Sequence, residues 1–200
     1  MGIGFEREFL FVFGLPIWII VRVFAMWFKK KRGKMILAKR EILLNLFFVY
    51  LLCVLAVTFF PLYISWGEFR ETWFSINVVP VYSTINDIMK TTGDSNITNF
   101  MMKFWVKNIG GNILLLLPLG TMLPMMWKRF ESIKKTIIFG FCFSLCIEVL
   151  QLLSGFIGVW GRAFDIDDIL LNTVGTFLGF IIFSKIIRRK LPSLLLDQQN

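Results

Sequence analysis

The sequence predicts an all-α integral membrane protein: a bundle of about five transmembrane helices with an interfacial segment on the outer face. Hydrophobic residues make up 56% of the 200-residue chain, and the mean hydropathy is +0.71, too apolar for a soluble globular domain. Five apolar stretches reach the length of about 20 residues that a helix needs to cross a bilayer. Short basic blocks flank these stretches, which indicates a membrane surface.

The predicted spans cover roughly residues 9–28, 42–64, 108–127, 133–153 and 166–187. We expect the first to be a retained helix, because Glu6 and Glu8 stand where a signal peptide has a basic region. Arg22, inside this span, is expected to snorkel to the inner interface. The expected division is 1–40 for the first helix and a basic cytoplasmic loop, 41–190 for a multi-helix membrane domain and 191–200 for a cytoplasmic tail.

The basic residues predict the orientation in the cell membrane. Fifteen of the 22 Lys and Arg residues lie within residues 29–40, 128–135 and 185–190, and six lie on the opposite side of a five-span arrangement. Because cytoplasmic loops are rich in Lys and Arg, we expect a multi-pass protein with its N-terminus outside and its C-terminus in the cytoplasm. The net charge of +9 is therefore attributed to a membrane surface and not to nucleic acid.

The composition also limits the chemistry that the chain can perform. It has no His, which excludes His-based nucleophile triads and HExxH zinc sites. Its three Cys lie inside apolar runs and predict no disulfide framework. The outer segment, roughly 65–107, is rich in Trp and Phe and is interrupted by Pro80, so we expect non-helical chain that lies at the level of the lipid headgroups.

Small and polar residues recur every three or four positions in the last three spans, so each span has a polar face. The topology places these faces at one depth in the outer half of the membrane, where they predict a polar pocket open to the outside. Arg162, just before the fifth span, is expected to reach the carboxylates. The candidate pocket residues are Asn108, Asn112, Glu148, Gln151, Arg162, Asp165, Asp168 and Asn172.

Parts of this predicted pocket also have a purely structural explanation. The residues from Asp165 to Asp168 can cap the fifth span and stabilise its first turn. Gly175 and Gly179, four residues apart, are typical of a close helix contact. Asn108 and Asn112 can simply link helices through hydrogen bonds.

Glu148 is the strongest functional candidate, because a carboxylate at a helix centre costs about 2.5–3.5 kcal/mol and Gln or Ser would link helices equally well. Three states would make it tolerable: an ion pair with Arg162, a protonated carboxyl group, or a divalent cation shared with Asp165 and Asp168. The residues alone leave these three open. No cofactor is predicted beyond that divalent cation.

Motifs at these positions resemble the VanZ-like family of bacterial membrane proteins, named after a teicoplanin-resistance protein. They are NIGGNILLLLPLGTMLP in the third span, Glu148 and Gln151 as ExxQ in the fourth, and GRAFDIDDILLNTVGTFLG at the fifth. INVVPVYS is similar to the family's Asn-x-x-Pro element through Asn77 and Pro80. The resemblance covers roughly residues 77–183. The matching motif residues are Asn112, Pro118, Gly120, Glu148, Gln151, Arg162, Asp165, Asp167, Asp168, Asn172 and Gly175.

The resemblance implies a link to low-level resistance against teicoplanin-type glycopeptides, whose lipid tail anchors them in the membrane. We therefore expect a protein that binds or remodels amphipathic molecules at the outer leaflet. Its expected partners are the lipid bilayer and a lipoglycopeptide or a lipid-linked cell-wall precursor. The alternative is a membrane-embedded enzyme that acts on a lipid-linked cell-envelope substrate with carboxylate or metal chemistry. A transporter is disfavoured, because the sequence has no inverted repeat.

Overall fold

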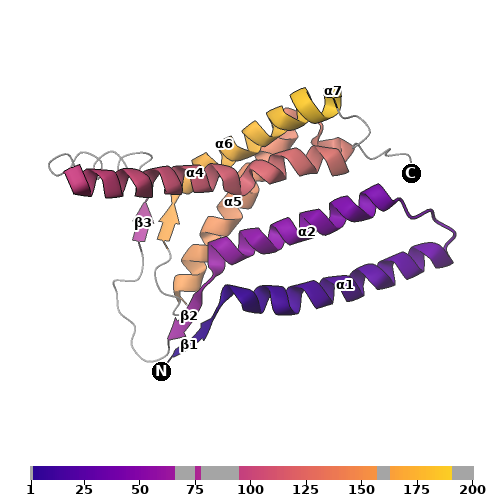
Figure 1. Cartoon of the computed structure of the whole chain (residues 1–200), viewed down its shortest axis with the longest axis horizontal. Coiled ribbons are helices and arrows are strands. Elements are labelled where there is room, and N and C mark those ends of the chain that lie inside the picture. Colours follow the sequence, from indigo (N-terminus) through magenta and orange to yellow (C-terminus); the bar gives the residue numbers. More distant parts are fainter. Residues whose placement is uncertain (1, 66–74, 78–94, 157–162, 191–200) are drawn as a thin grey trace.

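The computed structural model describes the chain except for residues 1, 66–74, 78–94, 157–162 and 191–200. The described residues contain five helices that are long and apolar enough to cross a membrane, which confirms the predicted fold class (Figure 1). They are α1 (Arg7–Lys31), α2 (Ala38–Phe59), α4 (Ser95–Met126), α5 (Ile133–Phe156) and α6 (Ile166–Ile182). The last helix continues through η3 (Phe183–Ile187) into α7 (Arg188–Lys190), and η2 (Lys128–Phe130) lies between α4 and α5.

Helix α4 differs from its predicted extent, because it begins at Ser95 and not near residue 108. Residues 95–107 are therefore helical, where the sequence predicted non-helical chain. The physical reason is local: no Pro or Gly interrupts the sequence between Ser95 and Ile109, so the helical hydrogen bonds continue upstream of the apolar run. Most of the remaining predicted interfacial segment lies outside the described residues.

Two short strand pairs, which the sequence did not predict, connect segments far apart in the chain. Strand β1 (Gly2–Phe5) pairs antiparallel with β2 (Leu62–Ser65). Strand β3 (Ser75–Asn77) pairs in parallel with β4 (Ala163–Asp165), and this register places Asn77 opposite Asp165. The second pair therefore fixes the chain directly before α6 against a segment from the first half of the protein.

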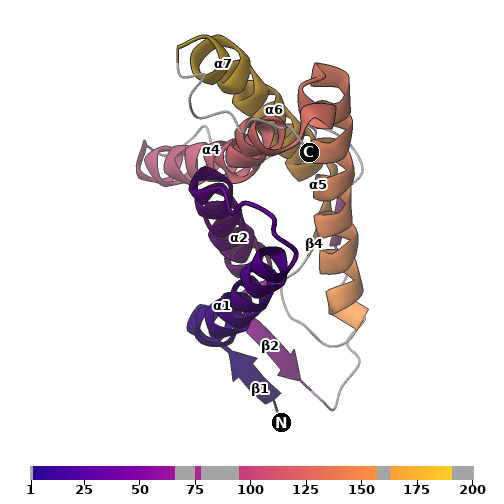
Figure 2. The same ribbon diagram turned by 90° about the vertical axis from the view of Figure 1, so that its right-hand side faces the viewer.

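Helix α2 lies between α1 and the pair formed by α4 and α6 in both views of the molecule (Figures 1 and 2). Hydrogen bonds attach it to α4 and to α5. The Tyr50 hydroxyl donates to the backbone oxygen of Leu115 on α4 at 2.8 Å, and Gln151 Nε2 on α5 donates to the backbone oxygen of Thr58 at 2.9 Å. In contrast, α1 has no buried residue, so its apolar side chains are available to lipid.

Helices α4 and α6 pack closely, because glycines let the two backbones touch. A Cβ atom added to Gly175 would lie 2.1 Å from the backbone oxygen of Ile113, and one added to Gly179 would lie 2.0 Å from that of Leu117. From the other side, a Cβ on Gly120 would lie 2.0 Å from the backbone oxygen of Thr176. The predicted close contact at Gly175 and Gly179 is therefore confirmed.

We expect Gly179→Ala to destabilise the protein by about 1–3 kcal/mol, because the new methyl group meets backbone atoms that cannot move aside. Gly110→Ala is the matched control: it lies on α4 with nothing within 4 Å of an added Cβ, so the higher helix propensity of Ala should leave stability unchanged or raise it by up to about 1 kcal/mol. Tryptophan fluorescence during thermal unfolding in detergent measures both. Equal midpoints for the two variants would contradict the close contact.

Candidate functional site

The site begins at the junction of β4 and α6, where Asp165 is the N-cap residue of the helix. Asp165 has an extended backbone, and its carboxylate accepts a hydrogen bond from the backbone N–H of Asp167 at 2.9 Å. Asp167 and Asp168 occupy the first turn, where the helix dipole favours negative charge. The predicted capping role of this acidic run is therefore confirmed, and the capping itself accounts for Asp165 and Asp167.

Glu148 on α5 reaches the same junction from a neighbouring helix. Its side chain is 2% exposed, and its Oε2 accepts a hydrogen bond from the backbone N–H of Asp165 at 3.0 Å. A buried carboxylate needs hydrogen-bond donors in place of water, and the N-cap backbone supplies one here. Glu148 thus joins the end of α5 to the start of α6.

Two amide side chains complete the arrangement. Asn77 Nδ2 on β3 donates to Asp165 Oδ1 at 3.0 Å, and Asn112 Nδ2 on α4 donates to Asp168 Oδ1. We call Glu148, Asp165 and Asp168, with these two amides, the carboxylate cluster. The cluster therefore gathers three acidic side chains where α4, α5 and α6 meet.

A second polar layer lies one helical turn further along α5 and α6. Asn172 Nδ2 donates to Ser144 Oγ at 2.9 Å, and the two residues are 1% and 0% exposed. Within the described part of the chain, Asn172 Oδ1 is buried and has no hydrogen-bond partner. Thr176, the next residue on this face, donates to the backbone oxygen of Asn172 at 3.1 Å. The polar face of α6 therefore continues inward from the cluster.

The structure brings most of the predicted pocket residues together, but not all of them. Asn112, Glu148, Asp165 and Asp168 form the cluster, with Asn172 in the layer next to it. Gln151 is instead bonded to the backbone of Thr58 on α2, and Asn108 is exposed on α4. Arg162 lies outside the described residues. That these residues form a functional pocket stays a prediction.

Asn77 was not among the predicted pocket residues, although it belongs to a sequence motif that was recognised. The residue stands in the NVVP element, but nothing in that element says that it pairs with a strand near residue 165. The β3–β4 register supplies this information. Thr58, the acceptor for Gln151, carries no signal at all, because its backbone oxygen and not its side chain makes the bond.

The described residues give no direct evidence for a metal centre. Among them, no group of three His, Cys, Asp or Glu side chains is arranged to hold a metal ion. Hard cations such as Mg²⁺ and Ca²⁺ require several oxygen ligands that converge on one point. A divalent cation at Glu148, Asp165 and Asp168 therefore stays a prediction.

A protein-family model matches most of the chain. The family model described as VanZ/LLP1 matches residues 47–188, a stretch that includes the whole carboxylate cluster and excludes α1. No curated protein and no solved structure matches the chain.

We expect Asn112→Ala to lower the free energy of unfolding by about 1 kcal/mol, the scale of hydrogen bonds between membrane helices. The reason is that this change removes the donor to Asp168, the side-chain link from α4 to the cluster. Asn108→Ala, on the exposed surface one turn away, is the control and should change little. Unfolding in mixed detergent measures both variants, and an equal loss in each would contradict a specific role for the Asn112 bond.

Proposed function

Because this chain belongs to the VanZ/LLP1 family, we propose that its carboxylate cluster binds amphipathic molecules at the outer leaflet and thereby contributes to teicoplanin-type glycopeptide resistance. The observation that carries the proposal is that the buried Glu148 carboxyl group binds the backbone N–H of Asp165 at the start of α6, where Asn112 also binds Asp168 in the first turn. Carboxylates held together at such cost inside an apolar bundle favour a ligand-binding role.

The chemistry of the cluster favours a ligand that is rich in hydrogen-bond donors. Carboxylates accept hydrogen bonds and carry negative charge, and Asn172 Oδ1 adds a buried acceptor in the next layer. Sugar hydroxyl groups, amide N–H groups and ammonium groups would suit these acceptors. Teicoplanin-type glycopeptides and lipid-linked cell-wall precursors carry such groups together with a lipid anchor, so both fit the proposed ligand class.

The acidic and amide side chains of the site differ in exposure, which supports a ligand that approaches from the aspartate side. Asp165 and Asp168 are partly exposed, whereas Glu148 and Asn172 are 2% and 1% exposed. A headgroup would therefore meet the aspartates first, with Glu148 behind them. The lipid tail of the ligand would remain among the apolar side chains of the helices, many of which are exposed.

The proposal includes an orientation with the cluster on the outer side. The basic residues at the other ends of the helices support it: Lys29, Lys30 and Lys31 end α1, and the short α7 is Arg188–Lys190. The positive-inside rule assigns these ends to the cytoplasm. The start of α6 would then face the cell wall, with the N-terminus of the chain on the same side.

We expect Glu148→Gln and Asp168→Asn each to abolish protection against teicoplanin in a susceptible host, because each removes a charge from the cluster. Glu131→Gln is the matched control. Glu131 lies just before α5, at the end of that helix opposite to the cluster, and forms an ion pair with Arg188 at 3.8 Å. The measurement is teicoplanin and vancomycin susceptibility, with membrane insertion checked by fractionation. A wild-type protein that leaves teicoplanin susceptibility unchanged would refute the resistance proposal.

The same variants separate binding from catalysis. Purified protein is incubated with a labelled lipid-linked cell-wall precursor, with and without Mg²⁺, and both retention and conversion of the lipid are measured. The binding proposal predicts retention by the wild type, weaker retention by Asp168→Asn, and no conversion. Conversion that is lost in Glu148→Gln would favour the enzyme reading instead.

A further inference from the structure

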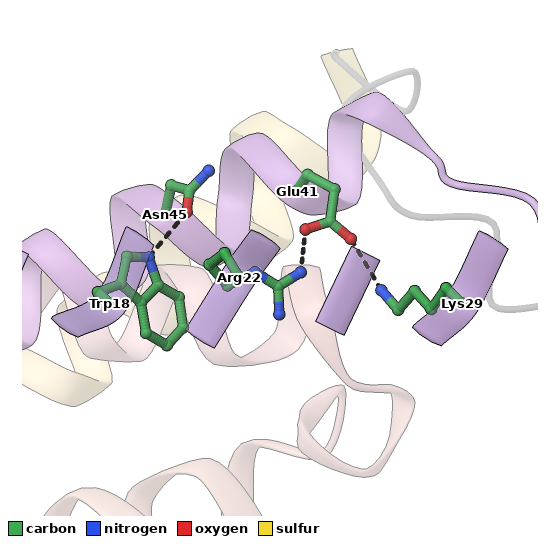
Figure 3. A network of polar contacts seen from close by, with 5 residues as sticks. All are labelled: Trp18, Arg22, Lys29, Glu41 and Asn45. Carbon is green, nitrogen blue, oxygen red and sulfur yellow. Dashed lines mark hydrogen bonds and ion pairs between the residues drawn. The ribbon is translucent and has the colours of Figure 1, made fainter. Parts of the chain in front are cut away.

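A second polar assembly lies between α1 and α2, in a part of the chain that the family match does not reach. Glu41, in the first turn of α2, accepts hydrogen bonds from Arg22 and from Lys29 on α1 (Figure 3). The Lys29 bond measures 2.8 Å, as does the one from Trp18 Nε1 to Asn45 Oδ1. That Arg22 snorkels to the inner interface stays a prediction, and the structure adds that a carboxylate on the next helix binds it.

This assembly carries an excess of positive charge and an unused donor. Two cations face one carboxylate, and the Arg22 side chain is only 14% exposed. Arg22 Nε is buried and has no hydrogen-bond partner in the described residues. A buried N–H donor without an acceptor destabilises a protein, so the assembly lacks one hydrogen-bond acceptor, and its two cations outnumber its one carboxylate.

The location of the assembly narrows the chemistry of that acceptor. Lys29 lies in the last turn of α1, where Lys30 and Lys31 follow it, at the membrane surface where lipid phosphates lie. Arg22 Cζ lies over the Trp18 ring, 5.5 Å from the ring centroid. Lys31 Nζ likewise lies 5.3 Å from the centroid of the Trp27 ring. Aromatic rings of this kind anchor helices at the headgroup level.

We propose that Arg22 and Lys29 form a binding site for the phosphate group of an anionic lipid. The planar guanidinium offers donors in a fixed fork that matches phosphate oxygens, and Lys29 adds a second charge. Glu41 holds both cations on the α2 side, and the exposed parts of the Arg22 and Lys29 side chains, 14% and 31% of each, remain for the phosphate. The site does not depend on the function proposed for the carboxylate cluster, which lies at the opposite end of the helices.

The test is native mass spectrometry of the full chain in mild detergent, with equal amounts of phosphatidylglycerol and phosphatidylcholine. We expect the wild type to retain phosphatidylglycerol preferentially and Arg22→Gln to lower that retention by roughly fivefold, the scale of one basic contact at a membrane surface. Lys34→Gln is the matched control, because it removes one exposed charge from the same basic segment and should change retention little. Equal losses in these two variants would overturn the site and leave only a diffuse basic surface.

Glu41→Gln distinguishes a phosphate site from an ion pair that only holds two helices together. Removal of the competing carboxylate should raise retention of phosphatidylglycerol, whereas a merely structural role predicts a loss that parallels Arg22→Gln. Arg22→Lys keeps a charge for Glu41 but lacks the guanidinium fork, so it should fold and still bind the lipid more weakly. Wild-type retention by Arg22→Lys, or a loss in Glu41→Gln, would overturn the proposal.

Inorganic phosphate separates the two sources of the phosphate group. Added at the concentration of the lipid, it should not displace phosphatidylglycerol, because the acyl chains contribute to binding beside the apolar surface of α1. Displacement by inorganic phosphate alone would overturn the assignment to a lipid headgroup.

Discussion

The backbone contact between α4 and α6 is the interaction on which the rest of the structure depends. Gly175 and Gly179 allow the two helices to approach until backbone atoms touch, and this proximity lets Asn112 reach Asp168. In a bilayer no hydrophobic force drives helices together, so close packing and interhelical hydrogen bonds must do so. The start of α6 is thereby fixed, and with it the position of β4.

Glu148 shows that a structural and a functional explanation can hold for one residue. It binds the backbone N–H of Asp165 and so stabilises the junction between β4 and α6. The same bond holds the carboxyl group beside the start of α6. A Gln at this position could accept the bond equally well, so the hydrogen bond alone does not account for a carboxyl group here.

The protein carries two polar assemblies of opposite character at the two ends of its helices. The carboxylate cluster is acidic and lies within the stretch that the family model matches. The assembly around Arg22, Lys29 and Glu41 is basic and lies before that stretch. Charges inside an apolar bundle are tolerated only when they are paired or have a ligand. The two ends would therefore attract ligands of opposite charge.

The sequence by itself determined the number and approximate extent of the spanning helices, the capping of α6 by Asp165 and the close approach at Gly175 and Gly179. These features follow from the length of the apolar stretches, from local backbone chemistry and from residue spacing along one helix. All three depend only on residues that are close together in the sequence. Only the tertiary structure decided that Asn77 pairs with Asp165, that Gln151 binds the backbone of α2, and that Glu41 is the partner of Arg22. Hydrogen bonds and ion pairs act over a few ångströms and depend on direction, so their partners are known only once the helices and strands have been placed against one another.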